Sequence, residues 1–213
     1  MQIIDISHRL DENTPLYPGD HALTLTKYKD LEADYYTSYV LQSGLHTGTH
    51  LDMPSHLTDD NRTAADFTAD RFIGRGVLLD VRGQSPISMD ARYEELIKRD
   101  DIVLLYTGFG ERYFREEYFT QYPVVSGELG EFLISRKIKM LGMDMPAPDY
   151  APFALHKALL ANEIFLLENL TNLHSLLYAA ELEVIALPLK IAAEASLTRA
   201  VCRICYTKGR KNQ

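Results

Sequence analysis

The chain has 213 residues, of which 46% are hydrophobic and 24% charged, and its formal net charge is −8. This composition is typical of a globular protein with a sizeable core, and we expect residues 1–213 to form one domain. The acidic balance argues against a nucleic-acid partner, because the only basic cluster in the sequence is the short run from Lys208 to Lys211.

The sequence predicts a cytoplasmic protein that does not enter a membrane. Its first six residues lack the basic start and long apolar stretch of a signal peptide, and apolar runs elsewhere are too short to cross a bilayer. Cys202 and Cys205 have C-x-x-C spacing, but a zinc finger needs four ligands and there is no second pair. Both cysteines fall in a predicted strand that places them on opposite faces, which argues against a metal or redox role.

The N-terminal quarter of the chain is predicted to be rich in strands. Residues 2–8 form a first strand, and residues 14–20 form a stiff turn, because two prolines and a glycine surround Tyr17. Alternating apolar and polar residues predict a strand over 22–30, and β-rich composition predicts another over 35–43. These two strands lead into a histidine-rich segment, so we place that segment in a sheet or barrel rather than a helix bundle.

Strands and helices follow one another irregularly in the remainder of the chain. The predicted strands are 76–81, 101–107, 140–144, 164–168, 183–191 and 198–206. The predicted helices are 64–70, 88–99, 126–136, 154–162 and 173–179, and residues 113–118 form a short helix or lid. Ser88 and Ser126 are expected N-caps. The pattern predicts a mixed α/β fold, in which a mixed sheet or barrel carries helices on its outer faces.

The segment from His46 to His56 concentrates three histidines and a carboxylate in eleven residues, His-Thr-Gly-Thr-His-Leu-Asp-Met-Pro-Ser-His. Its glycine, β-branched threonines and proline argue against a helix. In a straight strand His46 and His50 would stand roughly 13 Å apart, too far to reach one ion at about 2.1 Å. We therefore expect a bend at Gly48 that draws His46, His50 and Asp52 together.

A second candidate group lies further along the chain. Glu168 ends the apolar strand 164–168, and because burial of a bare charge is costly we expect this carboxylate to be paired or to bind a ligand. His156 lies twelve residues before it, on the predicted helix 154–162.

Together these residues resemble the cyclase family of metal-dependent hydrolases, which includes bacterial kynurenine formamidases and isatin hydrolases. The segment His46 to His56 looks like the family signature H-x-G-T-H-x-D-x-P-x-H. Other similar elements extend along most of the chain: Tyr17-Pro18-Gly19-Asp20, Leu105-Tyr106-Thr107-Gly108, Gly142-Met143-Asp144, the pair His156 and Glu168, and Ser196-Leu197-Thr198-Arg199-Ala200. The chain departs from the usual family residues at Tyr17, Ala147 and Ala195, where Trp, Ser and Gly are frequent.

The resemblance implies a metal site. His46, His50 and Asp52 would bind a first divalent ion. Asp52 and Glu168 would bridge to a second ion, completed by His156. A mixed set of nitrogen and oxygen donors suits Zn²⁺ or Mn²⁺, with one or two ions per subunit.

The resemblance also implies a reaction. His56 would be the acid/base, because a histidine with a pKa near about 6.5 can take a proton from water and return it to a leaving amine. Tyr17 would line the substrate pocket. The reaction would be hydrolysis of an amide-like C–N bond in a small molecule by metal-activated water, with N-formylkynurenine as one candidate substrate.

Family members fold as a swivelling β/β/α domain with a barrel-like core and they oligomerise, so the resemblance implies a homodimer or homotetramer. The sequence leaves three functions open. The first is the amidohydrolase, acting on a formamide or on another amide, lactam or imide, as an isatin hydrolase does. The second is a cyclase or dehydratase that uses the metal as a Lewis acid. The third is a non-catalytic metal- or ligand-binding protein.

Overall fold

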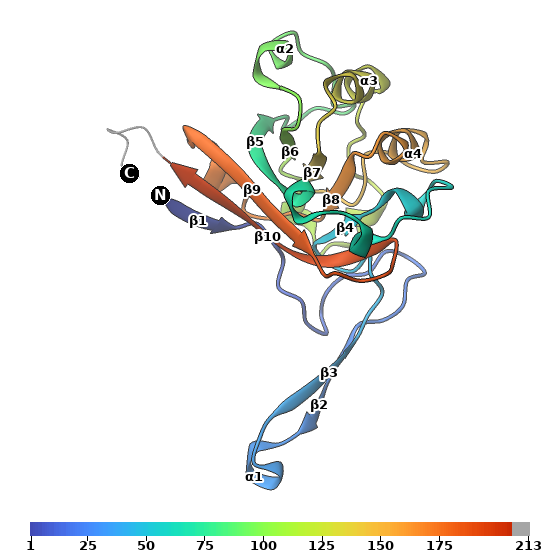
Figure 1. The fold of residues 1–213 in the computed structure, drawn as a ribbon, viewed down its shortest axis with the longest axis vertical. Coiled ribbons are helices and arrows are strands. Elements are labelled where there is room, and N and C mark those ends of the chain that lie inside the picture. The colour runs from blue at the N-terminus through green and yellow to red at the C-terminus, as the bar shows by residue number, and fades with distance from the viewer. Residues whose placement is uncertain (206–213) are drawn as a thin grey trace.

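A barrel-like sheet forms the centre of the computed structural model, which describes residues 1–205. The sheet has eight strands in the order β1-β10-β4-β8-β7-β6-β5-β9, and β9 pairs again with β10. That second pairing closes the seven strands from β10 to β9 into a ring, while β1 extends the sheet from β10 (Figure 1). Lys208 to Lys211, and Tyr206 at the end of the last predicted strand, lie outside the described residues.

The strands of this sheet are β1 (Gln2–Asp5), β4 (His50–Asp52), β5 (Ile73–Asp80), β6 (Ile102–Tyr106), β7 (Met140–Met143), β8 (Phe165–Glu168), β9 (Glu181–Pro188) and β10 (Ala195–Cys205). The helices are α1 (Leu31–Asp34), α2 (Tyr93–Leu96), α3 (Gly127–Arg136) and α4 (Ala154–Ala161). Six 3₁₀ turns complete the described elements: η1 (Pro54–His56), η2 (Ala64–Asp66), η3 (Ala69–Phe72), η4 (Phe109–Arg112), η5 (Glu116–Phe119) and η6 (Leu173–Leu176). The prediction of a mixed α/β fold with a barrel-like sheet and flanking helices is confirmed.

The parallel strands β5 to β8 are apolar on both faces because each face is covered. In β6, Ile102 and Leu104 belong to the cluster that fills the barrel. Val103 and Leu105 point the other way and join the cluster that includes Leu129 of α3. The barrel therefore has an inner core and an outer core, and α3 and α4 pack over the outer one (Figure 1).

The same alternation turns the polar residues of β4 and β8 outward. Leu51 and Leu167 are opposite each other and belong to the inner core. Their neighbours must therefore face the outer side, where His50 is directly opposite Glu168 in this antiparallel pair. Two of the predicted site residues are thus neighbours across the sheet, on the face that α4 covers.

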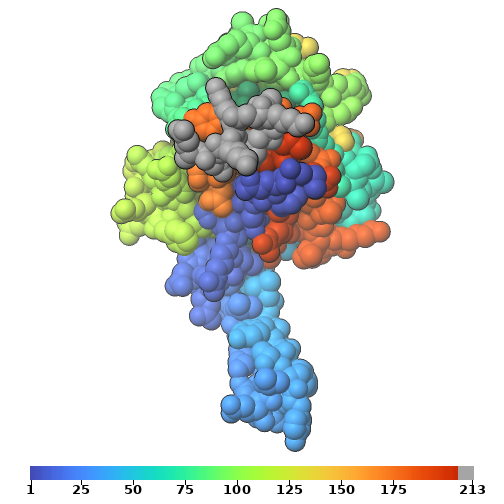
Figure 2. Space-filling model, turned by 90° about the vertical axis from the view of Figure 1, so that its left-hand side faces the viewer, coloured from blue at the N-terminus to red at the C-terminus, as the bar shows by residue number. Residues whose placement is uncertain are grey.

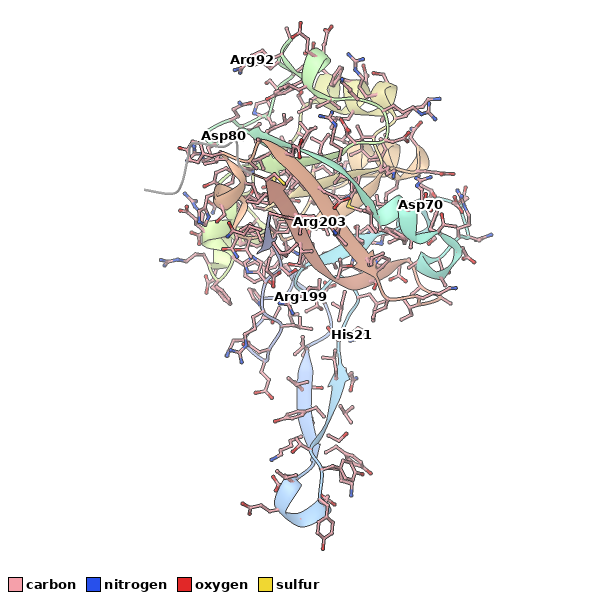
Figure 3. All side chains as sticks on the ribbon, turned by 60° about the vertical axis from the view of Figure 1, so that its left-hand side comes forward. His21, Asp70, Asp80, Arg92, Arg199 and Arg203 are labelled. Carbon is pink, nitrogen blue, oxygen red and sulfur yellow. The ribbon has the colours of Figure 1, made fainter. Side chains whose placement is uncertain are left out.

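Strands β2 (Thr24–Lys29) and β3 (Ser38–Gln42) form a separate two-stranded sheet. With α1 at its tip this hairpin projects from the body as an arm, here defined as residues 24–42 (Figures 1 and 2). Both strands were predicted, and the histidine segment to which they lead does enter the barrel-like sheet, at β4. Their side chains point into solvent on both faces, and His21 marks the place where the arm leaves the body (Figure 3).

The prediction of a helix over residues 88–99 is wrong. Only the single turn α2 forms, and Ser88 does not cap it. Instead Ile87 forms an isolated parallel β-bridge with Val125, which holds the backbone just before Ser88 in an extended conformation. The Asp90 side chain then accepts a hydrogen bond from the Arg92 backbone N–H, which favours a turn over a continuous helix.

Most other elements occur where they were expected. Helix α3 begins after Ser126, whose hydroxyl accepts a hydrogen bond from the Leu129 N–H, as an N-cap does. The predicted helix over 64–70 consists of two separate 3₁₀ turns, η2 and η3. Cys202 is buried in the inner core, Cys205 is half-buried, and both thiols are free. Among the described residues, no helix combines the length and hydrophobicity needed to cross a lipid bilayer.

The close packing around Gly142 of β7 predicts that a larger residue there destabilises the protein. A Cβ added there would lie 2.5 Å from Leu104 Cδ2 and 3.0 Å from Leu170 Cδ1, and both leucines are fully buried. Gly142→Ala should therefore lower the free energy of unfolding by about 1–3 kcal/mol, measured by urea denaturation. Gly127→Ala is the control, because a Cβ at that position meets nothing within 4 Å. Equal stability of the two variants would contradict the packing described here.

Candidate metal centre

The predicted bend lies at Gly48, whose φ of +63° falls in the left-handed region that favours glycine. The bend ends the turn that carries His46, and β4 begins two residues later at His50. Leu10 lies close behind, with its Cδ1 3.1 Å from the position of a Cβ on residue 48. Any side chain at this position would be strained both by its backbone angle and by this contact.

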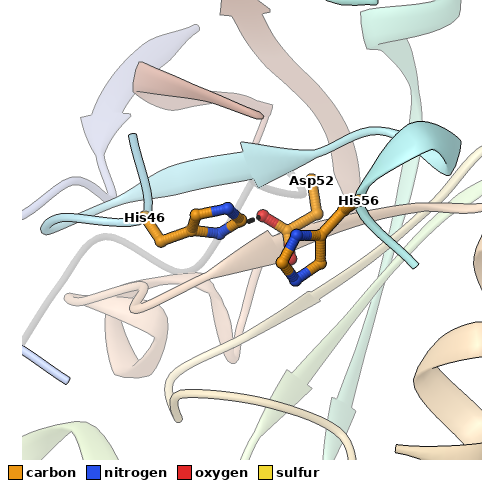
Figure 4. Close-up of side chains that lie close together, drawn as sticks. All are labelled: His46, Asp52 and His56. Carbon is orange, nitrogen blue, oxygen red and sulfur yellow. Dashed lines mark ion pairs between the residues drawn. The ribbon is translucent and has the colours of Figure 1, made fainter. Parts of the chain in front are cut away.

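Asp52 lies at the centre of the imidazoles that the sequence singled out. Its Oδ1 is 2.9 Å from His46 Nδ1 (Figure 4). The same oxygen is 3.4 Å from His50 Nε2. Its Oδ2 is 3.1 Å from His156 Nε2, which comes from the first turn of α4. The two carboxylate oxygens therefore face different groups of histidines.

Glu168 completes the cluster from the opposite strand. Its Oε2 lies 3.4 Å from His50 Nε2. Relative exposures are 2% for His50, 1% for Asp52, and 4% for both His156 and Glu168. The structure thus brings together all five predicted metal ligands, His46, His50, Asp52, His156 and Glu168, and four of them are buried.

Among residues 1–205, several buried atoms of this cluster have no partner in hydrogen-bonding geometry: His50 Nε2, Asp52 Oδ1, His156 Nδ1 and Glu168 Oε1. Buried polar atoms are usually satisfied, so each of these needs an explanation. The unpartnered atoms are imidazole nitrogens and carboxylate oxygens, which are the donors that a divalent cation takes. The residues present therefore fit a metal ion.

The described residues contain two sets of possible ligands. Within each set the donor atoms lie within 4.8 Å of one another, and both sets contain Asp52. One set is His50, Asp52 and Glu168, all buried. The other is His46, Asp52 and His56. Together with the contact between Asp52 and His156, these sets offer room for one ion or for two ions that share Asp52.

The charges of the cluster are strongly coupled. Burial would raise the pKa of Asp52, but His46, His156 and His50 hold it well below its usual range. Burial and the neighbouring Asp52 carboxylate raise the pKa of Glu168. Burial would lower the pKa of His46, but Asp52, with Glu168 and Glu194, raises it to about 9. In the absence of a metal, a proton on His46 supplies positive charge beside the Asp52 carboxylate.

His56 behaves differently from the other histidines. It ends the 3₁₀ turn η1, and its ring centroid is 4.3 Å from that of His46 and 5.7 Å from that of His156. Burial, which outweighs the nearby Asp52 carboxylate, lowers its pKa, as do the charges of His46 and His156. His56 is therefore neutral near pH 7 and able to accept a proton.

A cavity of about 220 Å³ opens onto the cluster. Tyr17 lines it and is 39% exposed, with its ring edge-on to Phe119 at a centroid distance of 5.7 Å. The wall opposite the polar cluster is mainly apolar, with Tyr17, Leu57, Phe119, Pro146, Ala147 and Phe153. The arrangement suits a small molecule with a flat apolar part and a polar group directed at the histidines.

Sequence reasoning missed two polar residues at this site. Glu194 lies just before β10, with its Oε1 3.6 Å from His46 Nε2. Asn169 directly follows Glu168, lines the cavity and has a positive φ of +56°. The position of Asn169 after a strand-ending carboxylate could have drawn attention to it, whereas the residues around Glu194 carry no comparable signal.

The raised pKa of His46 predicts that the stability of metal-free protein depends on pH. Folding raises this pKa from 6.5 to about 9, so the folded state holds the proton more tightly. The resulting stabilisation is complete below about pH 6.5 and is lost as the pH rises through 9. In chelator-treated protein, the difference in unfolding free energy between wild type and His46→Gln should therefore shrink between pH 6.5 and pH 9.5. A difference that stays constant or grows over this range would show that Asp52 does not hold a proton on His46.

Comparison with known proteins supports the family resemblance. A curated kynurenine formamidase from Bacillus cereus is 28% identical over 208 residues, covering 94% of this chain and 96% of its own. The solved isatin hydrolase A from Labrenzia aggregata has a TM-score of 0.83 at 24% identity, covering 94% of this chain and 93% of that one. A structure described as a predicted metal-dependent hydrolase from Bacillus stearothermophilus has a TM-score of 0.75 at 22% identity, covering 94% of this chain and 97% of that one.

A sequence model of the family described as "Putative cyclase" matches residues 4–150, more than half of the chain and the whole of the His46 to His56 segment. The two solved structures are under 25% identical and show that the fold is shared. The family match adds the relationship in sequence, and this chain belongs to the cyclase family.

Proposed function

We propose that this protein is a metal-dependent hydrolase that cleaves an amide-like C–N bond in a small molecule. The observation that carries the proposal is the buried cluster around Asp52, where imidazole nitrogens and carboxylate oxygens converge and, among the described residues, four of these atoms have no partner in hydrogen-bonding geometry. Its relatives include a kynurenine formamidase, which acts on this class of bond. The donor set suits Zn²⁺ or Mn²⁺.

In this proposal His46, His50 and Asp52 would hold a first ion, because a nitrogen of each histidine lies within 3.4 Å of Asp52 Oδ1. Asp52, Glu168 and His156 would hold a second ion if two are bound, and His156 Nε2 lies 3.1 Å from Asp52 Oδ2. The chemistry supplied by a bound divalent ion is acidification of water and polarisation of a carbonyl group.

His56 acts as the acid/base in this proposal. Its lowered pKa leaves it neutral near pH 7, so it can take a proton from the attacking water. It can then return that proton to the nitrogen that leaves when the C–N bond breaks. His56 also lies within reach of His46 and Asp52, so the competing assignment for His56 is a metal ligand. Loss of an acid/base would remove turnover alone, whereas loss of a ligand would also weaken metal binding.

The cavity lining favours an aromatic amide as substrate. Tyr17 and Phe119 offer an apolar surface beside the cluster, and a cavity of about 220 Å³ suits a single aromatic ring system. N-formylkynurenine is the first candidate, because the curated relative is a kynurenine formamidase. A lactam such as isatin is the second, because the structural neighbour with a TM-score of 0.83 is an isatin hydrolase.

The activity is tested with purified protein that is stripped by a chelator and reloaded with Zn²⁺ or Mn²⁺. We expect hydrolysis of N-formylkynurenine, isatin or a formanilide only in the reloaded protein. His56→Ala should keep its metal and lose turnover by about 10²–10⁴-fold, the usual contribution of a general acid/base. His174→Ala is the control, because this exposed histidine lies outside the site.

Three results would count against parts of this account. If His56→Ala loses metal together with turnover, His56 is a ligand. If it retains full turnover, the acid/base assignment is wrong. If metal-loaded wild type hydrolyses no amide, lactam or imide, the protein is better described as a non-catalytic metal-binding protein. If it instead converts a substrate by ring closure or loss of water, the cyclase or dehydratase alternative is favoured.

We further propose that the protein is a homodimer or homotetramer whose arm binds a second copy of this chain. An isolated two-stranded hairpin is only marginally stable in water, and the arm is unpacked on both faces. On β3, Tyr39 and Leu41 share one face and Val40 lies on the other, and all three are 47–55% exposed. The arm leaves the body between Asp20 and His46, which both line the cavity, so a bound partner would lie beside the active site.

Size-exclusion chromatography with light scattering tests this assembly. We expect wild type to be a dimer or tetramer and the double variant Tyr36→Ser/Tyr39→Ser to be shifted toward the monomer, because these side chains are each 55% exposed on the arm. Tyr178→Ser is the control, since Tyr178 is 70% exposed on the body. A monomeric wild type would contradict the proposal. As the sequence predicted, we also propose that residues 1–213 form one domain and that the protein is cytoplasmic.

A further inference from the structure

His50 has a second ring nitrogen, Nδ1, which lies 2.9 Å from the carbonyl oxygen of Gly48. A carbonyl oxygen can only accept a hydrogen bond, so Nδ1 carries a proton and donates it. In the neutral ring this leaves Nε2 bare, and Nε2 is the atom that faces Asp52 and Glu168. The Gly48 carbonyl therefore determines which nitrogen of His50 is offered to a cation.

The same carbonyl oxygen accepts a second hydrogen bond, from Asn169 Nδ2 at 2.9 Å. The same reasoning fixes the orientation of the Asn169 amide, since only its nitrogen can donate to a carbonyl. Its Oδ1 must then face the Tyr118 hydroxyl, which donates to it at 2.9 Å. Tyr118 is 0% and Asn169 3% exposed, so bulk solvent does not compete for these bonds.

The backbone of Asn169 is held in place as well. Its φ of +56° is left-handed, a conformation that asparagine adopts more readily than most residues with a side chain. Its carbonyl oxygen accepts a hydrogen bond of 2.7 Å from the hydroxyl of Thr49, which lies between Gly48 and His50. The histidine loop and the residue after Glu168 are thus joined at two points.

We propose that Tyr118 and Asn169 are positioning residues, which act through the Gly48 carbonyl to direct His50 Nε2 at the metal. Within the described residues, the ion-pair contacts of Asp52 are all to histidines, so neither Tyr118 nor Asn169 takes part in them. The inference rests on the proposed function, because it concerns the metal that the cluster would hold. Outer hydrogen bonds of this kind usually contribute about 10–100-fold to metal affinity.

Three variants separate the parts of this arrangement. Tyr118→Phe removes the hydroxyl that orients the amide and leaves the ring in place. Asn169→Gly keeps the left-handed backbone and removes the amide. Asn169→Asp keeps the size of the side chain but places an acceptor against the Gly48 carbonyl, which should be the most damaging change.

Tyr113→Phe is the matched control. Tyr113 is also a buried tyrosine, with its ring centroid 5.2 Å from that of Tyr118, but its hydroxyl has no hydrogen-bond partner within the part of the chain that the structure describes. Loss of that hydroxyl should leave metal binding unchanged. A purely structural role of the tyrosines would instead lower the stability of the metal-free variants without a selective change at the metal.

The Kd for Zn²⁺ is measured by competition with a chromophoric chelator, and the visible spectrum of Co²⁺-loaded protein reports the ligand geometry. We expect the Kd to rise about 10-fold in Tyr118→Phe and Asn169→Gly and up to about 100-fold in Asn169→Asp, with an altered Co²⁺ spectrum. Wild-type affinity and spectrum in Tyr118→Phe and Asn169→Gly would overturn the inference. Failure of wild type itself to bind metal would instead overturn the proposed function, so the two failures are distinguishable.

Discussion

Burial of the Asp52 carboxylate among imidazoles is the constraint on which the rest of the site depends. A bare carboxylate that is 1% exposed is costly, and the cost is offset only if positive charge lies beside both of its oxygens. The fold meets this requirement from separate elements. The bend at Gly48 brings His46, β4 carries His50, and α4 brings His156. A barrel with two apolar cores supports these elements on a rigid face.

Much of the fold could be predicted because its strands are apolar on both faces. Runs such as 101–107 and 164–168 have no helical period and are bounded by turn residues, so they could be identified without knowledge of their partners. The arm could not be placed, because its alternating pattern specifies a strand but not the sheet to which the strand belongs. The helix predicted at 88–99 failed because the contact between Ile87 and Val125 is distant in sequence and outweighs local helix propensity.

The candidate site was more accessible from sequence than the fold around it. Residue type and spacing pointed to His46, His50 and Asp52, and the distance argument required the bend that occurs at Gly48. His156 and Glu168 entered mainly through the family resemblance, because more than a hundred residues separate them from Asp52. The position of Asn169 after Glu168 offered a weak signal, but the link from Tyr118 through Asn169 to the Gly48 carbonyl could not be predicted, since these hydrogen bonds depend on tertiary contacts that leave no local pattern.

The central claim is that this cluster is a metal centre, and anomalous X-ray diffraction tests it most directly. Crystals of protein loaded with Zn²⁺ should show an anomalous peak about 2.0–2.2 Å from His50 Nε2 and from an Asp52 oxygen. A second peak between Asp52 Oδ2, His156 and Glu168 would establish two ions per chain. The absence of any peak at Asp52 in crystals soaked with excess Zn²⁺ would contradict the account.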